Sequence, residues 1–247
     1  MLVVESISKY FGGLRAVREA SLNVESGRIT AVIGPNGAGK TTLFALISGF
    51  MKPTSGHIVY NSVNITGMPA YRLARQGIAR TFQVVQPFAG LSVLENIAVG
   101  AHLHIAKRAE ALAAAANVAR LVGLEPMLHQ AASILTVAGR KRLELARALA
   151  TSPKLLLLDE VLAGLNPSEI RDMVPVIRAI SQRGVTIMMI EHVMQAVMSL
   201  AEQIYVLVEG GVISHGPPAA VAADPKVIEA YLGAGAAAKL AGGVRAD

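Results

Sequence analysis

Two short, continuously apolar runs are the most regular hydrophobic features of the chain, Leu155–Leu158 and Val185–Ile190. Each has the length of a strand and lacks a polar face, which is typical of parallel strands that helices cover on both sides. Between them, Ser168–Arg183 has the length of a crossover helix, and we expect Pro175 to interrupt or kink it. The pattern therefore predicts an α/β core.

Residues 1–66 predict strands and turns. Strand-like segments lie at Leu2–Val4, Ser21–Val24 and Ile29–Ile33, with a turn at Ser26–Gly27 before the last of them. Thr41–Phe50 follows with apolar residues at helical spacing. A strand, a glycine-bearing loop and a helix are thus expected in succession.

Residues from about 84 to 153 differ in character. Ala106–Val122 is rich in alanine and contains no glycine or proline, so it predicts a helix. A second helix is expected at Gly139–Thr151, ended by Pro153. We interpret the whole segment, about 84–153, as a helical subdomain inserted into the α/β core.

The C-terminal part predicts a hairpin and a tail. Ile204–Ile213 contains Gly210 and Gly211 at its middle, which favours two strands joined by a tight turn. Residues 234–247 are rich in alanine and glycine, so we expect a flexible tail there. The chain is therefore predicted to be a single domain over residues 1–233.

The loop between the third strand and the following helix carries a phosphate-binding motif. Residues 34–41 satisfy the pattern G-x-x-x-x-G-K-[ST] in full. The candidate nucleotide-binding residues are Gly34, Pro35, Asn36, Gly37, Ala38, Gly39, Lys40, Thr41 and the adjoining Thr42. The glycines allow backbone N–H groups to point at phosphates, Lys40 supplies charge, and the Thr41 hydroxyl can bind magnesium. A loop of this kind between a strand and a helix predicts binding of ATP with Mg²⁺.

A second candidate set follows the first apolar run. Asp159 stands at the expected carboxyl end of a buried strand, where it can hold magnesium directly or through water. Glu160 beside it can orient and deprotonate an attacking water. The alternative is an acidic pair that merely caps a core strand, and the upstream phosphate loop favours the functional interpretation.

Composition narrows the class of protein. Hydrophobic residues make up 53% of the 247 residues and charged residues 16%, and there is no cysteine, which predicts a folded protein without disulfides. No apolar run reaches the roughly 18–20 residues that span a bilayer. With no leader-like start, the sequence predicts a soluble cytoplasmic protein. The net charge of +6 is dispersed and aromatics are 4%, so no nucleic-acid partner is expected.

With these motifs in place, the chain resembles the ATP-binding subunit of an ABC transporter from residue 2 to about 233. The resemblance implies a P-loop NTPase core, a mostly parallel sheet with an N-terminal antiparallel β part and the helical insertion. It assigns Phe11 in KYFGG to adenine stacking, Gln83 in ARTFQ to magnesium and water, and His192 in MIEHVM to the γ-phosphate. The alternatives are a core ring for Phe11, a loop amide for Gln83 and a helix cap for His192.

The family's signature segment departs from its usual LSGGQ sequence in this protein. The equivalent residues are Leu135, Thr136, Val137, Ala138 and Gly139. Thr136 keeps the hydroxyl, whereas both glycines are replaced. In addition, Val161 replaces a usual proline, and Asn166 replaces a usual aspartate. Because the resemblance implies that this segment serves the partner subunit's ATP, we hypothesise a dimer with unequal sites.

Within the family, the chain is most similar to high-affinity branched-chain amino-acid uptake systems. The segments that carry this similarity are residues 77–100, the IEH around His192 and DPKVIEAYLG at 224–233. The resemblance implies two membrane permease subunits, a second ATP-binding subunit, an extracytoplasmic binding protein and a place on the cytoplasmic face of the inner membrane. Phe88 and Leu91 would contact a permease or fill the helical subdomain's core. Alternatives are a lipopolysaccharide-type exporter ATPase, a non-transport ABC ATPase and a degenerate regulatory nucleotide binder.

Overall fold

The structure is a computed structural model, and it describes residues 1–83 and 86–233. Its centre is a six-stranded sheet in the order β10-β9-β3-β8-β7-β6. Its strands are β3 (Ile29–Ile33), β6 (Ile78–Arg80), β7 (Leu155–Asp159), β8 (Thr186–Ile190), β9 (Gln203–Val208) and β10 (Gly211–Gly216). All neighbours pair in parallel except β9 and β10, which form the predicted hairpin.

The parallel strands are buried on both faces, as their apolar runs predict. Along β7, Leu155 and Leu157 belong to one hydrophobic cluster, and Leu156 and Leu158 belong to another. Successive side chains of a strand point to opposite faces, so each face of the sheet has its own core. This is the predicted P-loop NTPase architecture.

An antiparallel sheet in the order β2-β1-β4-β5 covers one of these faces together with α1 (Lys40–Ile47). Its strands are β1 (Leu2–Phe11), β2 (Leu14–Val24), β4 (Ser55–Tyr60) and β5 (Val63–Asn64). The predicted segments at 2–4 and 21–24 are only the regular ends of β1 and β2. Register shifts after Val4 break the apolar alternation, which explains why the pattern did not extend further.

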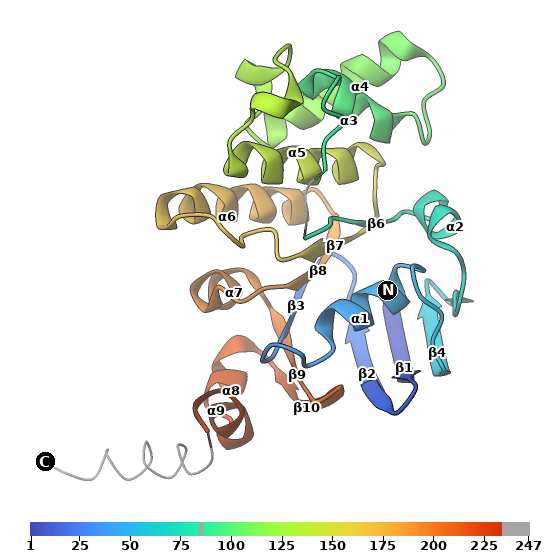
Figure 1. Ribbon diagram of the computed structural model, residues 1–247, viewed down its shortest axis with the longest axis vertical. Helices are drawn as coiled ribbons and strands as arrows, with labels where there is room; N and C mark the ends of the chain where they lie inside the picture. The colour runs from blue at the N-terminus through green and yellow to red at the C-terminus, as the bar shows by residue number, and fades with distance from the viewer. Residues whose placement is uncertain (84–85, 234–247) are drawn as a thin grey trace, which may run out of the picture.

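Helices cover the other face, and Figure 1 shows them stacked above and beside the sheet. They are α3 (Val93–Ala101), α4 (Arg108–Leu121), α5 (Val137–Ala150), α6 (Pro167–Gln182) and α7 (Met194–Leu200). The remaining helices are α2 (Ala70–Arg75), α8 (Pro218–Ala222), α9 (Pro225–Leu232) and the 3₁₀ turns η1 (Glu125–Met127) and η2 (Ala132–Ile134).

Helices α3, α4 and α5 lie between β6 and β7 in the sequence. They pack against one another and form the part of the protein at the top of Figure 1. Ala111, Ala115 and Ala119 form the fully buried stripe of α4, so its alanines allow close helix packing. Gly100 of α3 lies against α5, because a Cβ there would be 2.4 Å from the Arg147 carbonyl oxygen.

The expected interruption at Pro175 is wrong, because α6 continues through it. Pro175 lies on the exposed side, where water can satisfy the carbonyl group that proline leaves without an N–H donor. Met173, Ile177 and Ile180 anchor the opposite face of the helix in the core.

Within residues 1–83 and 86–233, no helix is both long enough and apolar enough to cross a bilayer. The predicted tail, residues 234–247, lies outside the described residues.

Candidate nucleotide-binding site

The phosphate loop joins the end of β3 to the start of α1, as predicted. It lies so close to neighbouring strands that two of its positions have no room for a side chain. A Cβ at Gly34 would be 1.9 Å from the Leu207 carbonyl oxygen, and one at Gly39 would be 2.2 Å from that of Ala16. Gly39 also has φ +98°, a conformation that favours glycine. The loop is therefore shaped by its contacts with β9 and β2.

Lys40 folds back over the loop. Its Nζ donates hydrogen bonds to the carbonyl oxygens of Gly34 at 2.8 Å and Pro35 at 2.9 Å. Burial lowers the pKa of Lys40, and the negative charges of Glu160 and Asp159 oppose that shift. The ammonium group is thus held at the rim of the loop, next to both acidic residues.

A cavity of about 520 Å³ opens beside the loop. Its lining comprises Phe11, Leu14, Arg15, Ala16, Asn36, Gly37, Ala38, Gly39, Lys40, Thr41, Thr42, Glu160 and Glu209. The Phe11 side chain is 46% exposed, so it is not a core ring. Most of the predicted loop residues therefore share one cavity with Phe11 and Glu160.

Asp159 ends β7, and its side chain is 2% exposed. Its Oδ2 accepts a hydrogen bond of 2.7 Å from Nη2 of Arg80, which ends β6, and the two form an ion pair. Its Oδ1 is buried and has no hydrogen-bond partner among residues 1–83 and 86–233. Asp159 and Thr41 line a second cavity of about 490 Å³, together with Gln83. A carboxylate, a hydroxyl and an amide that line one cavity form a set of oxygen ligands that fits a hard cation such as Mg²⁺.

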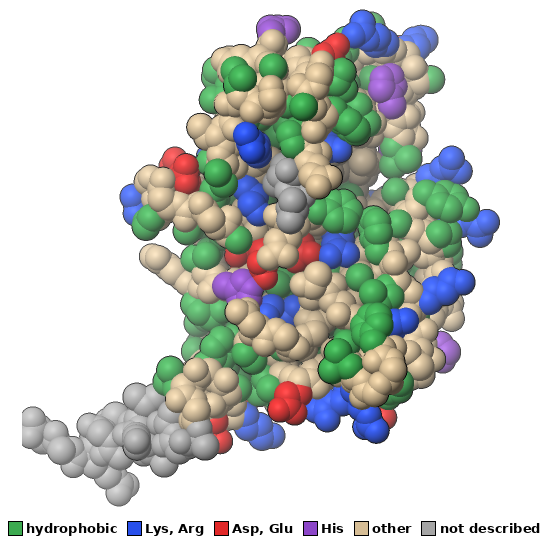
Figure 2. All heavy atoms as spheres, in the orientation of Figure 1, with side chains coloured by type: hydrophobic (Ala, Val, Ile, Leu, Met, Phe, Trp, Pro, Cys, Tyr) green, Lys and Arg blue, Asp and Glu red, His purple; other side chains and the backbone are tan. Residues whose placement is uncertain are grey.

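Glu160 is bound by both of the other residues predicted to act in catalysis. Nε2 of Gln83 donates to Glu160 Oε2 at 2.7 Å, and Nε2 of His192 lies 2.5 Å from Glu160 Oε1. His192 is therefore not a helix cap, and α7 begins only at Met194. Figure 2 shows acidic, basic and histidine side chains gathered at the middle of one face, between the helical part and the sheets.

Two buried residues that the sequence reasoning missed support this group. Lys141 of α5 donates from Nζ to the carbonyl oxygens of Gln83 at 3.3 Å and Glu160 at 3.0 Å. Glu191 is 1% exposed and accepts a hydrogen bond of 2.9 Å from the Leu162 N–H. Burial raises the pKa of Glu191 to about 7. The position of Glu191 next to His192 was the only signal in the sequence.

Residues Leu135 to Gly139 form the start of α5. The Thr136 hydroxyl caps the helix by accepting a hydrogen bond of 3.2 Å from the Gly139 N–H. Leu135 is buried, and Val137 is 56% exposed. In the part of the protein that the structure describes, none of these residues lines the cavity at the phosphate loop. Within the segment, Thr136 and Val137 are exposed at the protein surface.

Asn166 and Val161, the other two departures, have structural partners. The amide oxygen of Asn166 caps α6 by accepting hydrogen bonds from the N–H groups of Ser168 and Glu169, both at 3.0 Å. Val161 is buried in the core. Neither residue lines the cavity at the phosphate loop within the described residues.

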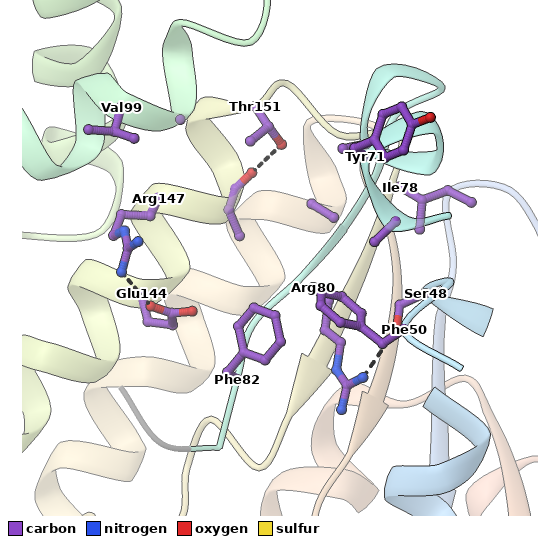
Figure 3. Close-up of a pocket in the computed structure, with 15 residues that line it drawn as sticks. Ser48, Phe50, Tyr71, Ile78, Arg80, Phe82, Val99, Glu144, Arg147 and Thr151 are labelled. Atoms are coloured by element: carbon purple, nitrogen blue, oxygen red, sulfur yellow. Dashed lines mark hydrogen bonds and ion pairs between the residues drawn. The ribbon is translucent and has the colours of Figure 1, made fainter. Parts of the chain in front are cut away.

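A groove of about 360 Å³ lies on the far side of Arg80 from the loop, between β6, α2, α3 and α5. Figure 3 shows Tyr71, Phe82 and Val99 around it, with the Arg147–Glu144 pair on one side. Phe88 is 46% exposed and stacks with the Arg147 guanidinium at 4.8 Å, so it does not fill the core of the helical part.

Comparisons with known proteins agree with this geometry. The family model described as ABC transporter matches residues 17–163, and one described as branched-chain amino acid ATP-binding cassette transporter matches residues 212–237. The chain belongs to the ABC transporter family, and the predicted fold and ATPase class are those of this family. Within it, the predicted resemblance to the branched-chain amino-acid group is also confirmed.

Individual relatives point the same way. The high-affinity branched-chain amino acid transport ATP-binding protein BraF of Pseudomonas aeruginosa is 38% identical over 94% of this chain and 98% of its own. LivG of Escherichia coli, which has the same description, is 37% identical over the same shares. The ADP conformation of MJ1267, an ATP-binding cassette of an ABC transporter, matches 94% of this chain and 98% of that one, with TM-score 0.86 and 32% identity. A dimeric cassette bound to ADP and Pi, MJ0796, shares the fold at 22% identity and TM-score 0.80.

Proposed function

We propose that this protein is the ATP-hydrolysing subunit of an importer for branched-chain amino acids or related amides. The observation that carries the proposal is the contact of Glu160 with both Gln83 and His192 beside the phosphate loop. A carboxylate held between a histidine and an amide at that place is suited to orient water for attack on a phosphate. The match of residues 212–237 to the branched-chain amino acid family model and the relatives' names support the substrate class.

In this site each residue has a separate task. Phe11 stacks on adenine, and residues Gly34 to Thr42 bind the phosphates, with Lys40 leaving its two carbonyl partners to do so. Thr41, Gln83 and Asp159 hold Mg²⁺, which supplies charge stabilisation at the phosphates. Glu160 is the general base, with His192 near the γ-phosphate. Within the residues that the structure describes, Oδ1 of Asp159 accepts no hydrogen bond, which supports the assignment of Asp159 to the metal.

A second ATP-binding subunit, alike or different, completes the working dimer. Thr136 and Val137 at the start of α5 are exposed, and among the described residues the signature segment does not line the cavity at this subunit's own phosphate loop. Both observations support a position facing the other subunit's ATP. Two such subunits would close head to tail over two nucleotides, and hydrolysis would reopen them. We propose residues 1–233 as one domain that includes the helical insertion at 84–153.

The groove next to Arg80 supports a contact with the membrane permease subunits. It is lined by apolar side chains from both the sheet and the helical part, and Phe88 lies exposed beside Arg147. A permease helix bound in this groove would contact both the sheet and the helical part, so it would be displaced when these two parts move relative to each other. The protein would then act on the cytoplasmic face of the inner membrane, with the extracytoplasmic binding protein contacting only the permeases.

Replacement of Glu160 tests the hydrolytic assignment. We expect Glu160→Gln to bind ATP with unchanged affinity, lose at least about a hundredfold in turnover and form a MgATP-dependent dimer by size exclusion. Glu110→Gln on the exposed surface of α4 is the matched control and keeps full turnover. Normal turnover in Glu160→Gln would refute the site.

The substrate class requires the complete transporter. We expect proteoliposomes that contain this subunit, its permeases and its binding protein to take up labelled leucine when ATP is inside. ATP-dependent uptake of urea or a short amide without leucine uptake would place the transporter in the related-amide class, and uptake of none of them would contradict the proposal.

A further inference from the structure

Arg80 connects the groove to the candidate magnesium cavity, because its side chain lines both. The side chain is only 8% exposed. One guanidinium nitrogen, Nη2, pairs with Asp159 at 2.7 Å, and Nη1 donates to the Ser48 hydroxyl at 3.1 Å. The third nitrogen, Nε, is buried and has no hydrogen-bond partner in the described part of the chain. Asp159 is thus held by a cation that belongs to the protein itself.

Aromatic rings surround this guanidinium. The centroids of Phe82, Phe50 and Phe44 lie 5.5, 5.8 and 6.0 Å from its central carbon. Phe50 and Phe82 also contact each other edge to face at 5.3 Å. Figure 3 shows both rings next to the Arg80 side chain, and both residues line the groove. Such rings favour a cation and keep water from it, which strengthens the pair with Asp159.

We propose that the ion pair between Arg80 and Asp159 competes with magnesium for the Asp159 carboxylate, and we call this ion pair the clasp. The proposal rests on the assignment of Asp159 to the metal. While the guanidinium neutralises the carboxylate, the buried acid is stable without a metal, and a cation must bind against a neighbouring positive charge. Because Phe50 and Phe82, two of the three rings around Arg80, also line the groove, a molecule bound in the groove would contact the rings that enclose the Arg80–Asp159 pair. Arg80 is a positioning residue, since it acts through Asp159.

Magnesium titration of nucleotide binding tests the clasp without relying on turnover. A fluorescent ATP analogue is bound to the purified protein in EDTA, and the Mg²⁺ concentration at half-maximal change is measured. Arg80→Met keeps an unbranched stem among the rings and removes the charge. We expect its magnesium midpoint to fall about tenfold, and its melting temperature without nucleotide to fall as well. An equal or higher midpoint would overturn the clasp.

Matched variants distinguish a fall in the magnesium midpoint caused by loss of the Arg80 charge from one caused by a disturbed structure. Arg80→Lys keeps the charge, and its midpoint should stay near that of the native protein. Arg147→Met removes a guanidinium from the same two cavities without touching Asp159, and its midpoint should not move. Should Arg80→Met not fold, Arg80→Gln gives the same comparison with a neutral donor. A shift in Arg147→Met as large as that in Arg80→Met would overturn the specific role of the pair.

Two further variants test the parts on which the clasp depends. Asp159→Asn should raise the magnesium midpoint strongly. If the midpoint of Asp159→Asn does not rise, the assignment of Asp159 to the metal is wrong. If it rises as expected but the midpoint of Arg80→Met does not fall, only the clasp is refuted. Phe82→Ala opens the rings from the groove side and should lower the midpoint, though less than loss of the charge. An unchanged midpoint in Phe82→Ala would overturn the role of the rings.

Discussion

The glycines around the nucleotide cavity provide a graded test of the loop geometry. An added methyl group meets nothing within 4 Å at Gly13 or Gly37, whereas at Gly39 it would lie 2.2 Å from the Ala16 carbonyl oxygen. Gly37 and Gly39 have φ of +80° and +98°. Replacement by alanine therefore adds nothing at Gly13, conformational strain at Gly37, and strain plus a clash with β2 at Gly39.

The expected magnitudes follow from these differences. A non-glycine residue in the left-handed region costs about 1–2 kcal/mol. The loop of the variant can relieve this strain by changing shape when it is free, and ATP must restore the strained shape, so Gly37→Ala should weaken ATP binding about tenfold. At Gly39 the clash adds about 1–3 kcal/mol, because backbone on both sides must move apart by most of an ångström. Gly39→Ala should therefore weaken binding about a hundredfold or more, with Gly13→Ala unchanged.

Fluorescence titration with an ATP analogue and magnesium measures these affinities, and thermal unfolding without nucleotide reports whether each variant is folded. The order Gly13, Gly37, Gly39 is the essential result. If Gly39→Ala is folded and binds as tightly as Gly13→Ala, the reasoning that contact with β2 shapes the phosphate loop is refuted.

Three other variants give sharp expectations. Glu191 has a folded pKa near 7 against 4.5 in the unfolded state, so the folded state keeps its proton longer and stability falls as pH rises from about 4.5 to 7. Glu191→Gln should remove about 3 kcal/mol of that fall in denaturant titrations, and an unchanged pH profile would contradict the burial argument. Ser92→Ala removes the reciprocal cap with Glu95 and should lower the free energy of unfolding by about 1 kcal/mol with ATP affinity unchanged; a stability equal to that of the native protein would contradict it. Val137→Gly should raise turnover of the assembled dimer if side-chain bulk weakens the signature, and unaltered turnover would argue against unequal sites.

The interior of the fold could be predicted from the sequence because its strands are buried on both faces. The predicted Ile29–Ile33 coincides with β3, and β7 and β8 differ from prediction by one residue at one end. Strand β4 and helix α3 were missed. The spacing of Ser92 and Glu95 was a usable signal for α3, since serine followed three residues later by glutamate is typical of a helix start.

The candidate site was only partly accessible from sequence. Phe11, Lys40 and Glu160, which the sequence analysis named as candidates, line one cavity. Gln83 and His192, which the resemblance assigned to magnesium and to the γ-phosphate, both contact Glu160. Their roles stay predictions. Arg80 could not be found, because Asp159 is 79 positions away in the sequence and β6 carries too few residues for a strand pattern. Nothing local in a sequence signals such a pairing.

Lys141 has a mechanical consequence. The Lys141 ammonium group on α5 donates hydrogen bonds to the backbone carbonyl oxygens of Gln83 and of Glu160, the proposed general base. The N-cap of the same helix is Thr136, which belongs to the signature segment proposed to face the other subunit's ATP. A rotation of α5 would therefore lengthen two hydrogen bonds to the backbone at Gln83 and at Glu160, the residue proposed as the general base. Lys141 lies about one helical turn from the N-terminus of α5. If that turn is rigid, a displacement of the helix N-terminus is transmitted through Lys141 to the backbone of Glu160.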